Sequence, residues 1–133
     1  MVIGFIMVVR TPLFELIRKK RPVKGSQDVW LHMDNARPHT SRQTSDFIAQ
    51  TKVKTLSHPP YSPDLAPCDF FLFPKLKDLL KGKTYSSDEE LTEALESALA
   101  TFNRSFISDM FEEWVKRCNR CVEVGGQYFE RLK

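Results

Sequence analysis

A run of prolines in the middle of the chain limits the fold more than any other feature. The segment extends from His58 to Pro67 and also contains Pro59, Pro60 and Pro63. Because proline fixes its own φ and has no backbone N–H, this composition excludes the interiors of helices and strands. We predict an extended, stiff loop here, with the regular elements of the chain on either side of it.

The residues before this loop predict short elements of both kinds. Apolar spacing indicates a helix over residues 13–20 and a mostly exposed helix over residues 40–50. Residues 29–33 are typical of a short buried strand, and residues 53–56 form a second strand candidate. The first strand ends at Asp34, so the fold is expected to present that carboxylate at a strand end.

The residues after the loop predict helices. Asp69 opens an apolar pattern with helical spacing over residues 70–80, in which Pro74 indicates a kink or a late helix start. Residues 86–90 carry a capping-box signature, in which a serine accepts an early backbone N–H and a glutamate returns the hydrogen bond. Two further helices are expected before and after Phe102, and we expect them to pair as a hairpin.

Composition sets broad limits on the class of protein. The apolar fraction of 41% is enough for the core of one domain, and 20 basic against 17 acidic residues leave a net charge of only +3. Three sparse cysteines do not make a disulfide framework, which favours a reducing cytosol or nucleus. The apolar residues 1–9 are too few to span a bilayer and are interpreted as a strand or a start-site artefact, so no membrane partner is expected.

Two aspartates stand at positions that suit a metal site. Asp34 ends a predicted strand, Asp69 begins a predicted helix, and 34 residues, positions 35 to 68, lie between them. The spacing alone is weak support, because an aspartate before a helix is most often an N-cap. A structural role therefore stays open for both residues.

The residues around the two aspartates carry a more specific signal. His-Met-Asp-Asn-Ala-Arg-Pro-His occupies residues 32–39, and residues 58–73 read His-Pro-Pro-Tyr-Ser-Pro-Asp-Leu-Ala-Pro-Cys-Asp-Phe-Phe-Leu-Phe. In order and separation these two motifs closely resemble the signature of mariner-like DNA transposases. The resemblance implies an α/β, ribonuclease H-like fold of the integrase and transposase type, with helices packed on a small mixed sheet. It also implies a partial catalytic domain over residues 13–133, truncated at its N-terminal strands, with residues 1–12 unplaced.

The same resemblance assigns chemistry to individual residues. Asp34 matches the family's second catalytic aspartate and Asp69 the third, and both would bind Mg²⁺ or Mn²⁺ in phosphodiester cleavage and strand transfer. Magnesium prefers hard oxygen ligands, so a few aspartates from different elements suffice to hold it. We expect Asn35 to orient Asp34 or a bound water. The residues expected to contact DNA phosphates are Arg37, His39, Lys75, Lys77 and Lys81.

One departure from the family pattern bears on activity. The resembled enzymes have a first catalytic aspartate on an upstream strand and an N-terminal helix-turn-helix DNA reader, and neither matches any residue of this chain. Asp28 is no substitute, because it lies in the turn that enters the same strand as Asp34. We therefore expect little or no strand cleavage from the chain alone, and whether it is an enzyme stays open.

An alternative function follows from this departure. It is a non-catalytic DNA-binding or dimerising remnant of a domesticated or decayed transposable element. In either case DNA is the expected partner, as transposon ends and target in the intact family. A homodimer is also considered, and the nucleus is the expected location.

Two smaller clusters have competing interpretations. The basic residues 18–21 suit a nuclear-import signal or a phosphate contact, but also an ordinary solvated helix end. Cys118 and Cys121 have the spacing of zinc ligands, but no second pair accompanies them. We predict that these two cysteines pack in the core.

Overall fold

The computed structural model describes residues 11–25, 27–51 and 53–127, and the chain divides into two compact units between Tyr61 and Ser62. The division falls inside the proline-rich segment that was predicted to be a stiff loop. The apolar run over residues 1–9, interpreted above as a strand or a start-site artefact, lies outside the described residues. The prediction of a single domain over residues 13–133 stays a prediction.

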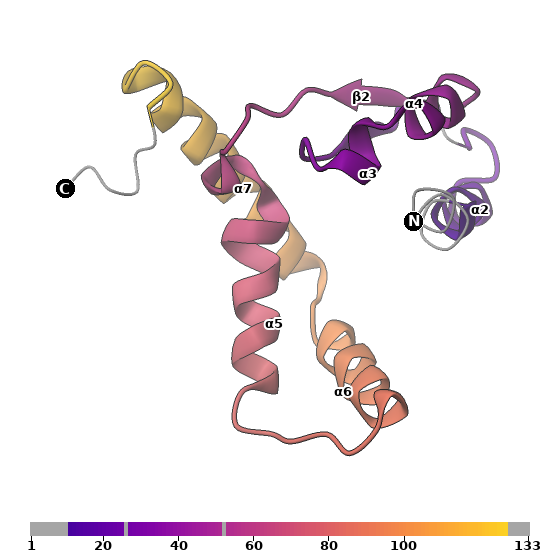
Figure 1. Cartoon of the computed structure of the whole chain (residues 1–133), viewed down its shortest axis with the longest axis vertical. Helices are drawn as coiled ribbons and strands as arrows, with labels where there is room; N and C mark the ends of the chain where they lie inside the picture. The colour runs from indigo at the N-terminus through magenta and orange to yellow at the C-terminus, as the bar shows by residue number, and fades with distance from the viewer. Residues whose placement is uncertain (1–10, 26, 52, 128–133) are drawn as a thin grey trace. The chain divides into compact units, whose positions relative to one another are not determined.

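The first unit is a small α/β arrangement. Its elements are α2 (Thr11–Lys20), β1 (Trp30–His32), α3 (Arg37–Thr40), α4 (Arg42–Ala49) and β2 (Lys54–Leu56), several of which are labelled in Figure 1. β1 and β2 pair in parallel, and His32 at the end of β1 lies opposite Leu56 at the end of β2. A parallel pair needs a crossover between its strands, and α3 and α4 provide it. The described sheet is therefore this parallel pair, where a mixed sheet was expected.

Packing in the first unit joins its helices. Phe14 of α2 is buried, and its ring centroid lies 5.8 Å from that of Phe47 in α4. Thr44 is fully buried, and its hydroxyl donates a hydrogen bond to the backbone carbonyl of Pro38 at 2.6 Å. This bond fixes α4 to the turn of α3. The strands are less covered than predicted, since Trp30 at the start of β1 is 59% exposed.

The second unit begins with two short helical turns and continues with three α-helices. Its elements are the 3₁₀ turn η2 (Pro63–Leu65), the π-helical segment η3 (Cys68–Leu72), α5 (Phe73–Leu80), α6 (Asp88–Ala100) and α7 (Arg104–Glu123). Pro74 lies in the first turn of α5, directly after the π-helical segment. A kink or a late helix start was predicted from Pro74; the structure has a π-helical segment over Cys68–Leu72, and the α-helix starts at Phe73.

The start of α6 is a capping box displaced by one residue. Ser87 is the N-cap, and its hydroxyl accepts the backbone N–H of Glu90 at 3.2 Å. The Glu90 carboxylate accepts hydrogen bonds from the backbone amide and the hydroxyl of Ser86, both at 2.7 Å. Two serines therefore share the role that one serine has in the usual arrangement.

The helices of the second unit pair differently from the prediction. α6 packs against α5, and the chain then continues into α7 without folding back along α6 (Figure 1). An aromatic cluster fixes this junction, because the Phe106 ring stacks on Phe102 at 4.1 Å and lies 4.9 Å from Phe71 of η3. The expected hairpin of the last two helices is therefore wrong, and α7 instead contacts the segment that precedes α5.

Apolar side chains remain exposed along the helices of this unit. Leu91, Leu95 and Leu99 form an exposed row on α6, and Ile107, Phe111 and Val115 form another on α7. Cys118 is also exposed and Cys121 is half-buried, so the prediction that both pack in the core is wrong for Cys118. Within the described ranges, no helix combines the length and the apolar character needed to cross a membrane.

Candidate functional site

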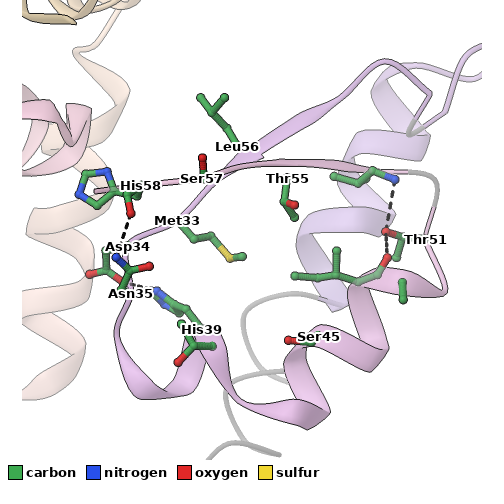
Figure 2. Close-up of a pocket in the computed structure, with 14 residues that line it drawn as sticks. Met33, Asp34, Asn35, His39, Ser45, Thr51, Thr55, Leu56, Ser57 and His58 are labelled. Atoms are coloured by element: carbon green, nitrogen blue, oxygen red, sulfur yellow. Dashed lines mark hydrogen bonds and ion pairs between the residues drawn. The ribbon is translucent and has the colours of Figure 1, made fainter. Parts of the chain in front are cut away.

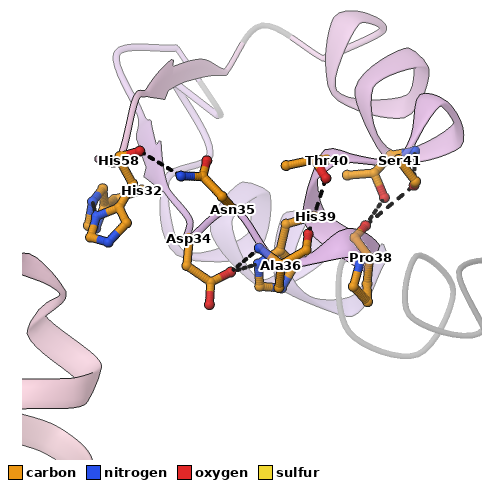
Figure 3. A network of polar contacts seen from close by, with 10 residues as sticks. His32, Asp34, Asn35, Ala36, Pro38, His39, Thr40, Ser41 and His58 are labelled. Atoms are coloured by element: carbon orange, nitrogen blue, oxygen red, sulfur yellow. Dashed lines mark hydrogen bonds and ion pairs between the residues drawn. The ribbon is translucent and has the colours of Figure 1, made fainter. Parts of the chain in front are cut away.

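Asp34 lies two residues after the end of β1, where the chain turns toward α3. One carboxylate oxygen, Oδ1, accepts the backbone N–H of Ala36 at 3.1 Å and forms an ion pair with Nδ1 of His39 (Figure 3). The turn is local, since both partners lie within five residues of Asp34. The side chain is still 49% exposed. The strand end therefore presents an oriented carboxylate that solvent can reach.

The surroundings of Asp34 favour its charged form. Partial burial acts to raise the pKa of this carboxyl, but the Ala36 amide and the His39 hydrogen bond act in the opposite direction. The nearby charges of His39 and His58 also lower it, so the net pKa of Asp34 is below its usual value. An ionised carboxylate is the form that binds a hard divalent cation.

Asn35, expected to orient Asp34 or a bound water, uses its side chain to contact the segment that follows β2. Its side-chain amide donates a hydrogen bond to the backbone carbonyl of His58 at 2.9 Å (Figure 3). Next to this bond, Nε2 of His32 lies 3.0 Å from Nδ1 of His58, with the two rings edge to face. These contacts join the residues that follow β1 to the residues that follow β2. Asn35 thus acts on the position of Asp34 through the backbone.

The two imidazoles of this pair share one hydrogen bond, so one ring must donate and the other accept. Burial and the neighbouring His58 lower the pKa of His32, although the nearby Asp34 acts to raise it. The pair therefore favours a neutral His32 ring. The hydrogen bond between the two rings connects the end of β1 to the residues that follow β2.

An open cavity of about 660 Å³ lies beside Asp34. Figure 2 shows Asp34, Asn35, His39 and His58 at one end of it and Thr51 at the other. The apolar part of its lining comes from Met33 after β1, Ile48 and Ala49 of α4, Val53 before β2 and Leu56 of β2. The ionisable lining residues Asp34, His39 and His58 thus lie together at one end of the cavity.

Asp69 lies in the first turn of η3, in the second unit. Its backbone N–H donates to the carbonyl of Ala66 at 2.9 Å, and its side chain is exposed. The N-cap of η3 is Pro67, so Asp69 is not the cap that the simplest structural interpretation gave. Within the described residues, no hydrogen bond to the Asp69 carboxylate is found. Asp64, the other acidic residue of the motif, is 3% exposed and is not placed to bind a ligand from solvent.

The predicted DNA-contacting residues are mostly exposed. Arg37 is the first residue of α3, Lys75 and Lys77 lie on α5, and Lys81 directly follows that helix. Residues two apart on a helix do not face the same side, so Lys75 and Lys77 cannot form one continuous patch. His39 is half-buried, and its Nδ1 faces Asp34.

Sequence reasoning missed Arg117 of α7. Its guanidinium donates to the backbone carbonyl of Asp64 at 3.2 Å and lies over the Phe70 ring. No local signal marks this residue, because 53 positions separate it from Asp64 in the sequence. Among the described residues, no group of three or more His, Cys, Asp or Glu side chains is arranged to hold a metal ion.

Comparison with known proteins identifies relatives of this chain. It is 30% identical over 115 residues to the human histone-lysine N-methyltransferase SETMAR, covering 86% of this chain and 16% of that protein. It is 31% identical over 117 residues to the mariner Mos1 transposase of Drosophila mauritiana, covering 86% of this chain and 34% of that protein. No protein-family model matches the chain.

Solved structures of Mos1 agree with this relationship. The catalytic domain of Mos1 mariner transposase superposes with a TM-score of 0.83 at 30% identity, covering 90% of this chain and 59% of that one. The Mos1 paired end complex with Mn gives 0.82 at 30% identity, covering 90% and 35% of the two chains. The Mos1 catalytic domain with raltegravir and Mg gives 0.80 at 26% identity, covering 93% and 61%.

These matches confirm the predicted ribonuclease H-like fold class and the resemblance carried by the two motifs. The chain spans about a third of the length of the Mos1 transposase and a smaller share of SETMAR. Sequence and structure together identify the chain as a homologue of the mariner transposases that matches part of their catalytic domain.

Proposed function

We propose that this chain contributes two carboxylate ligands, Asp34 and Asp69, to the Mg²⁺- or Mn²⁺-dependent catalytic site of a mariner-like transposase. The observation that carries the proposal is the geometry of Asp34. A strand end holds this carboxylate, one of its oxygens is oriented by the Ala36 amide and by His39, and its pKa is depressed. The substrate class is DNA.

The donor set fits the metal that the proposal requires. Both side chains are carboxylates exposed to solvent, and hard oxygen donors that keep room for water are what Mg²⁺ and Mn²⁺ prefer. The solved Mos1 structures described with Mn and with Mg support the choice of ion. When bound, such an ion supplies Lewis-acid activation of a phosphodiester.

The residues beside Asp34 have supporting roles in this proposal. His39 helps to lower the pKa of Asp34 and limits its rotation, while Asn35 fixes the turn that carries both residues through its bond to His58. Arg37, one turn of chain away, is exposed and offers a guanidinium suited to phosphate oxygens. The turn thus combines a metal ligand with a phosphate contact.

DNA binding is proposed for the exposed basic residues of both units. Lys77 and Lys81, in and just after the last turn of α5, would contact the phosphate backbone, and Lys75 would contact a different stretch of it. The Mos1 paired end complex supports DNA as the partner. Action on chromosomal DNA would place the protein in the nucleus, and joining two transposon ends would suit a homodimer.

The metal assignment can be tested by titrating the 133-residue chain with MnCl₂ and following bound Mn²⁺ by electron paramagnetic resonance. Asp34→Asn and Asp69→Asn are each expected to weaken binding, because each removes an anionic oxygen donor. Asp46→Asn in the first unit and Asp78→Asn in the second are matched controls with exposed aspartates on helices. Equal Mn²⁺ binding by the wild type and both motif variants would reject the assignment.

A non-catalytic role is the competing proposal. It is favoured by the exposed apolar row Ile107, Phe111 and Val115 on α7, which suits a dimerising remnant. The two proposals differ in their dependence on metal. A gel shift with DNA that survives EDTA, together with Mn²⁺ binding unchanged in Asp34→Asn, would favour the remnant. Mn²⁺ binding that disappears in the motif variants would favour the catalytic segment.

A further inference from the structure

We infer that Arg117 of α7 is a positioning residue for Asp69. It fixes the backbone segment on which Asp69 lies, and so the direction in which the Asp69 carboxylate would face a bound metal ion. The inference rests on the proposed function of Asp69. Arg117 lies outside both sequence motifs. All the contacts on which the inference depends lie within the second unit. Its basis is a set of contacts that Arg117 makes at both ends of one short segment, residues 64–70.

The first group of contacts fixes the guanidinium itself. Nε of Arg117 donates to Oε1 of Glu113 at 3.1 Å, and these residues lie one turn apart on α7. The Arg117 side chain is only 19% exposed, so solvent screens it less than an ordinary surface arginine. Glu113 therefore holds the planar group in one orientation and offsets its charge.

The second group of contacts reaches the segment that precedes α5. Nη1 of Arg117 donates to the backbone carbonyl of Asp64 at 3.2 Å, and the guanidinium carbon lies 4.3 Å from the centre of the Phe70 ring. A guanidinium over an aromatic face is an attractive cation–π arrangement. One side chain thus holds the start of the segment through a hydrogen bond and its end through a ring.

Between these two points the backbone leaves Asp69 little freedom. Leu65 and Ala66 are buried, and the Ala66 carbonyl accepts the N–H groups of both Asp69 and Phe70 at 2.9 and 3.0 Å. Asp69 is therefore hydrogen-bonded to Ala66, which lies between the two residues that Arg117 contacts, and it is adjacent in sequence to Phe70. A shift of Arg117 would be transmitted to Asp69 through the adjacent Phe70 on one side and through Leu65 and Ala66 on the other.

Lysine cannot reproduce this arrangement. Its ammonium keeps the charge but has no rigid fork, so it cannot donate to Glu113 and Asp64 in fixed directions while it stacks on Phe70. Methionine keeps the length of the side chain and removes charge and donors together. The series Arg, Lys, Met therefore separates charge from geometry at one position.

The effect should appear as weaker metal binding at Asp69. Loss of a residue that orients a metal ligand typically weakens metal affinity by about 10- to 100-fold. In NMR, we expect Arg117→Met to raise the MnCl₂ concentration at which the Asp69 amide resonance has lost half of its intensity. The expected increase is about tenfold. Arg117→Lys should fall between Arg117→Met and the wild type.

The matched control is Arg120→Met on the same helix, where the arginine pairs locally with Glu123 at 3.3 Å. This variant removes the same charge from α7 and should leave the broadening of Asp69 unchanged. Circular dichroism melts of every variant report global stability. A second variant, Phe70→Leu, removes the ring under Arg117 and should also weaken broadening, so the test holds even where Arg117→Met fails to fold.

The outcomes distinguish a failure of the positioning role of Arg117 from a failure of Asp69 as a metal ligand. If Asp69→Asn leaves Mn²⁺ broadening of this segment intact, the assignment of Asp69 as a ligand fails. If Asp69→Asn abolishes the broadening while Arg117→Lys and Phe70→Leu leave it at the wild-type concentration, the positioning role is overturned. A lowered melting temperature with unchanged broadening would likewise reduce Arg117 to a structural residue.

Discussion

The side-chain amide of Asn35 donates a hydrogen bond to the backbone carbonyl of His58, with 2.9 Å between nitrogen and oxygen. This bond joins the two chain segments that leave the parallel strands, one residue after Asp34. Asn35→Ala should lower the free energy of unfolding by about 0.5–1.5 kcal/mol, the usual net contribution of such a bond. Urea denaturation measures the change, and Gln43→Ala, at an exposed position of α4, is the control. An Asn35→Ala variant no less stable than Gln43→Ala would show that the bond does not hold the turn.

The ion pair between Asp34 and His39 predicts a change in titration. Because His39 contributes to the depressed pKa of the Asp34 carboxyl, His39→Ala should raise that pKa toward its usual range. The ¹³C chemical shift of the carboxyl carbon, followed against pH, reports it directly. Thr40→Ala, at the next position along the chain, should leave the Asp34 titration as it is in the wild type. An unchanged curve in His39→Ala would mean that the Ala36 amide and His58 lower this pKa without a contribution from His39.

The shared capping box of α6 predicts acid sensitivity at the start of this helix. The hydrogen bonds from the Ser86 hydroxyl and amide lower the pKa of the Glu90 carboxyl. A depressed folded-state pKa gives stability that is present above the unfolded value and is lost as pH falls through the folded value. Hydrogen exchange at the first-turn amides of α6 should therefore speed up below about pH 4.5, after correction for intrinsic exchange. Glu90→Gln should remove this pH dependence, and a transition that persists in Glu90→Gln would assign it to another group.

The exposed lysines after η3 predict a salt-dependent effect on DNA binding. The double variant Lys77→Ala, Lys81→Ala should weaken binding and reduce the slope of log K against log salt by about 0.9 for each phosphate that is no longer neutralised. Fluorescence anisotropy with duplex DNA between low and physiological salt measures both quantities. Lys116→Ala, an exposed lysine on α7, is the control for charge alone. An equal slope in the double variant and the control would place the DNA-binding surface elsewhere.

Much of the fold could be predicted because its determinants are local. The strands that flank α3 and α4, the start of α5 next to Pro74 and the capping of α6 each depend on neighbours within a few residues. The position of Asp34 at a strand end was likewise readable from the apolar run before it. The signature over residues 86–90 did not say which serine is the cap, and the structure assigns that role to Ser87.

The pairing of the helices could not be predicted in the same way. An apolar stripe shows which face of a helix is buried but does not name the partner, so the last two helices were paired with each other although α6 packs on α5. The contact of Arg117 with Asp64 was hidden for a related reason. It depends on the tertiary path of α7, and 53 residues separate its two ends.

The wide turn at η3 has a consequence for the length of this part of the chain. The Phe73 amide bonds to the Cys68 carbonyl five residues back, whereas an α-helix uses the residue four back. Each residue of an α-helix advances the direction of its side chain by about 100°. Deleting one residue from Phe70, Phe71 and Leu72 would let an ordinary helical turn form there and would rotate Asp69 by that angle about the axis of α5. Insertions and deletions in this stretch should therefore be tolerated far less well than substitutions, because the number of residues in the segment determines the direction of the Asp69 carboxylate.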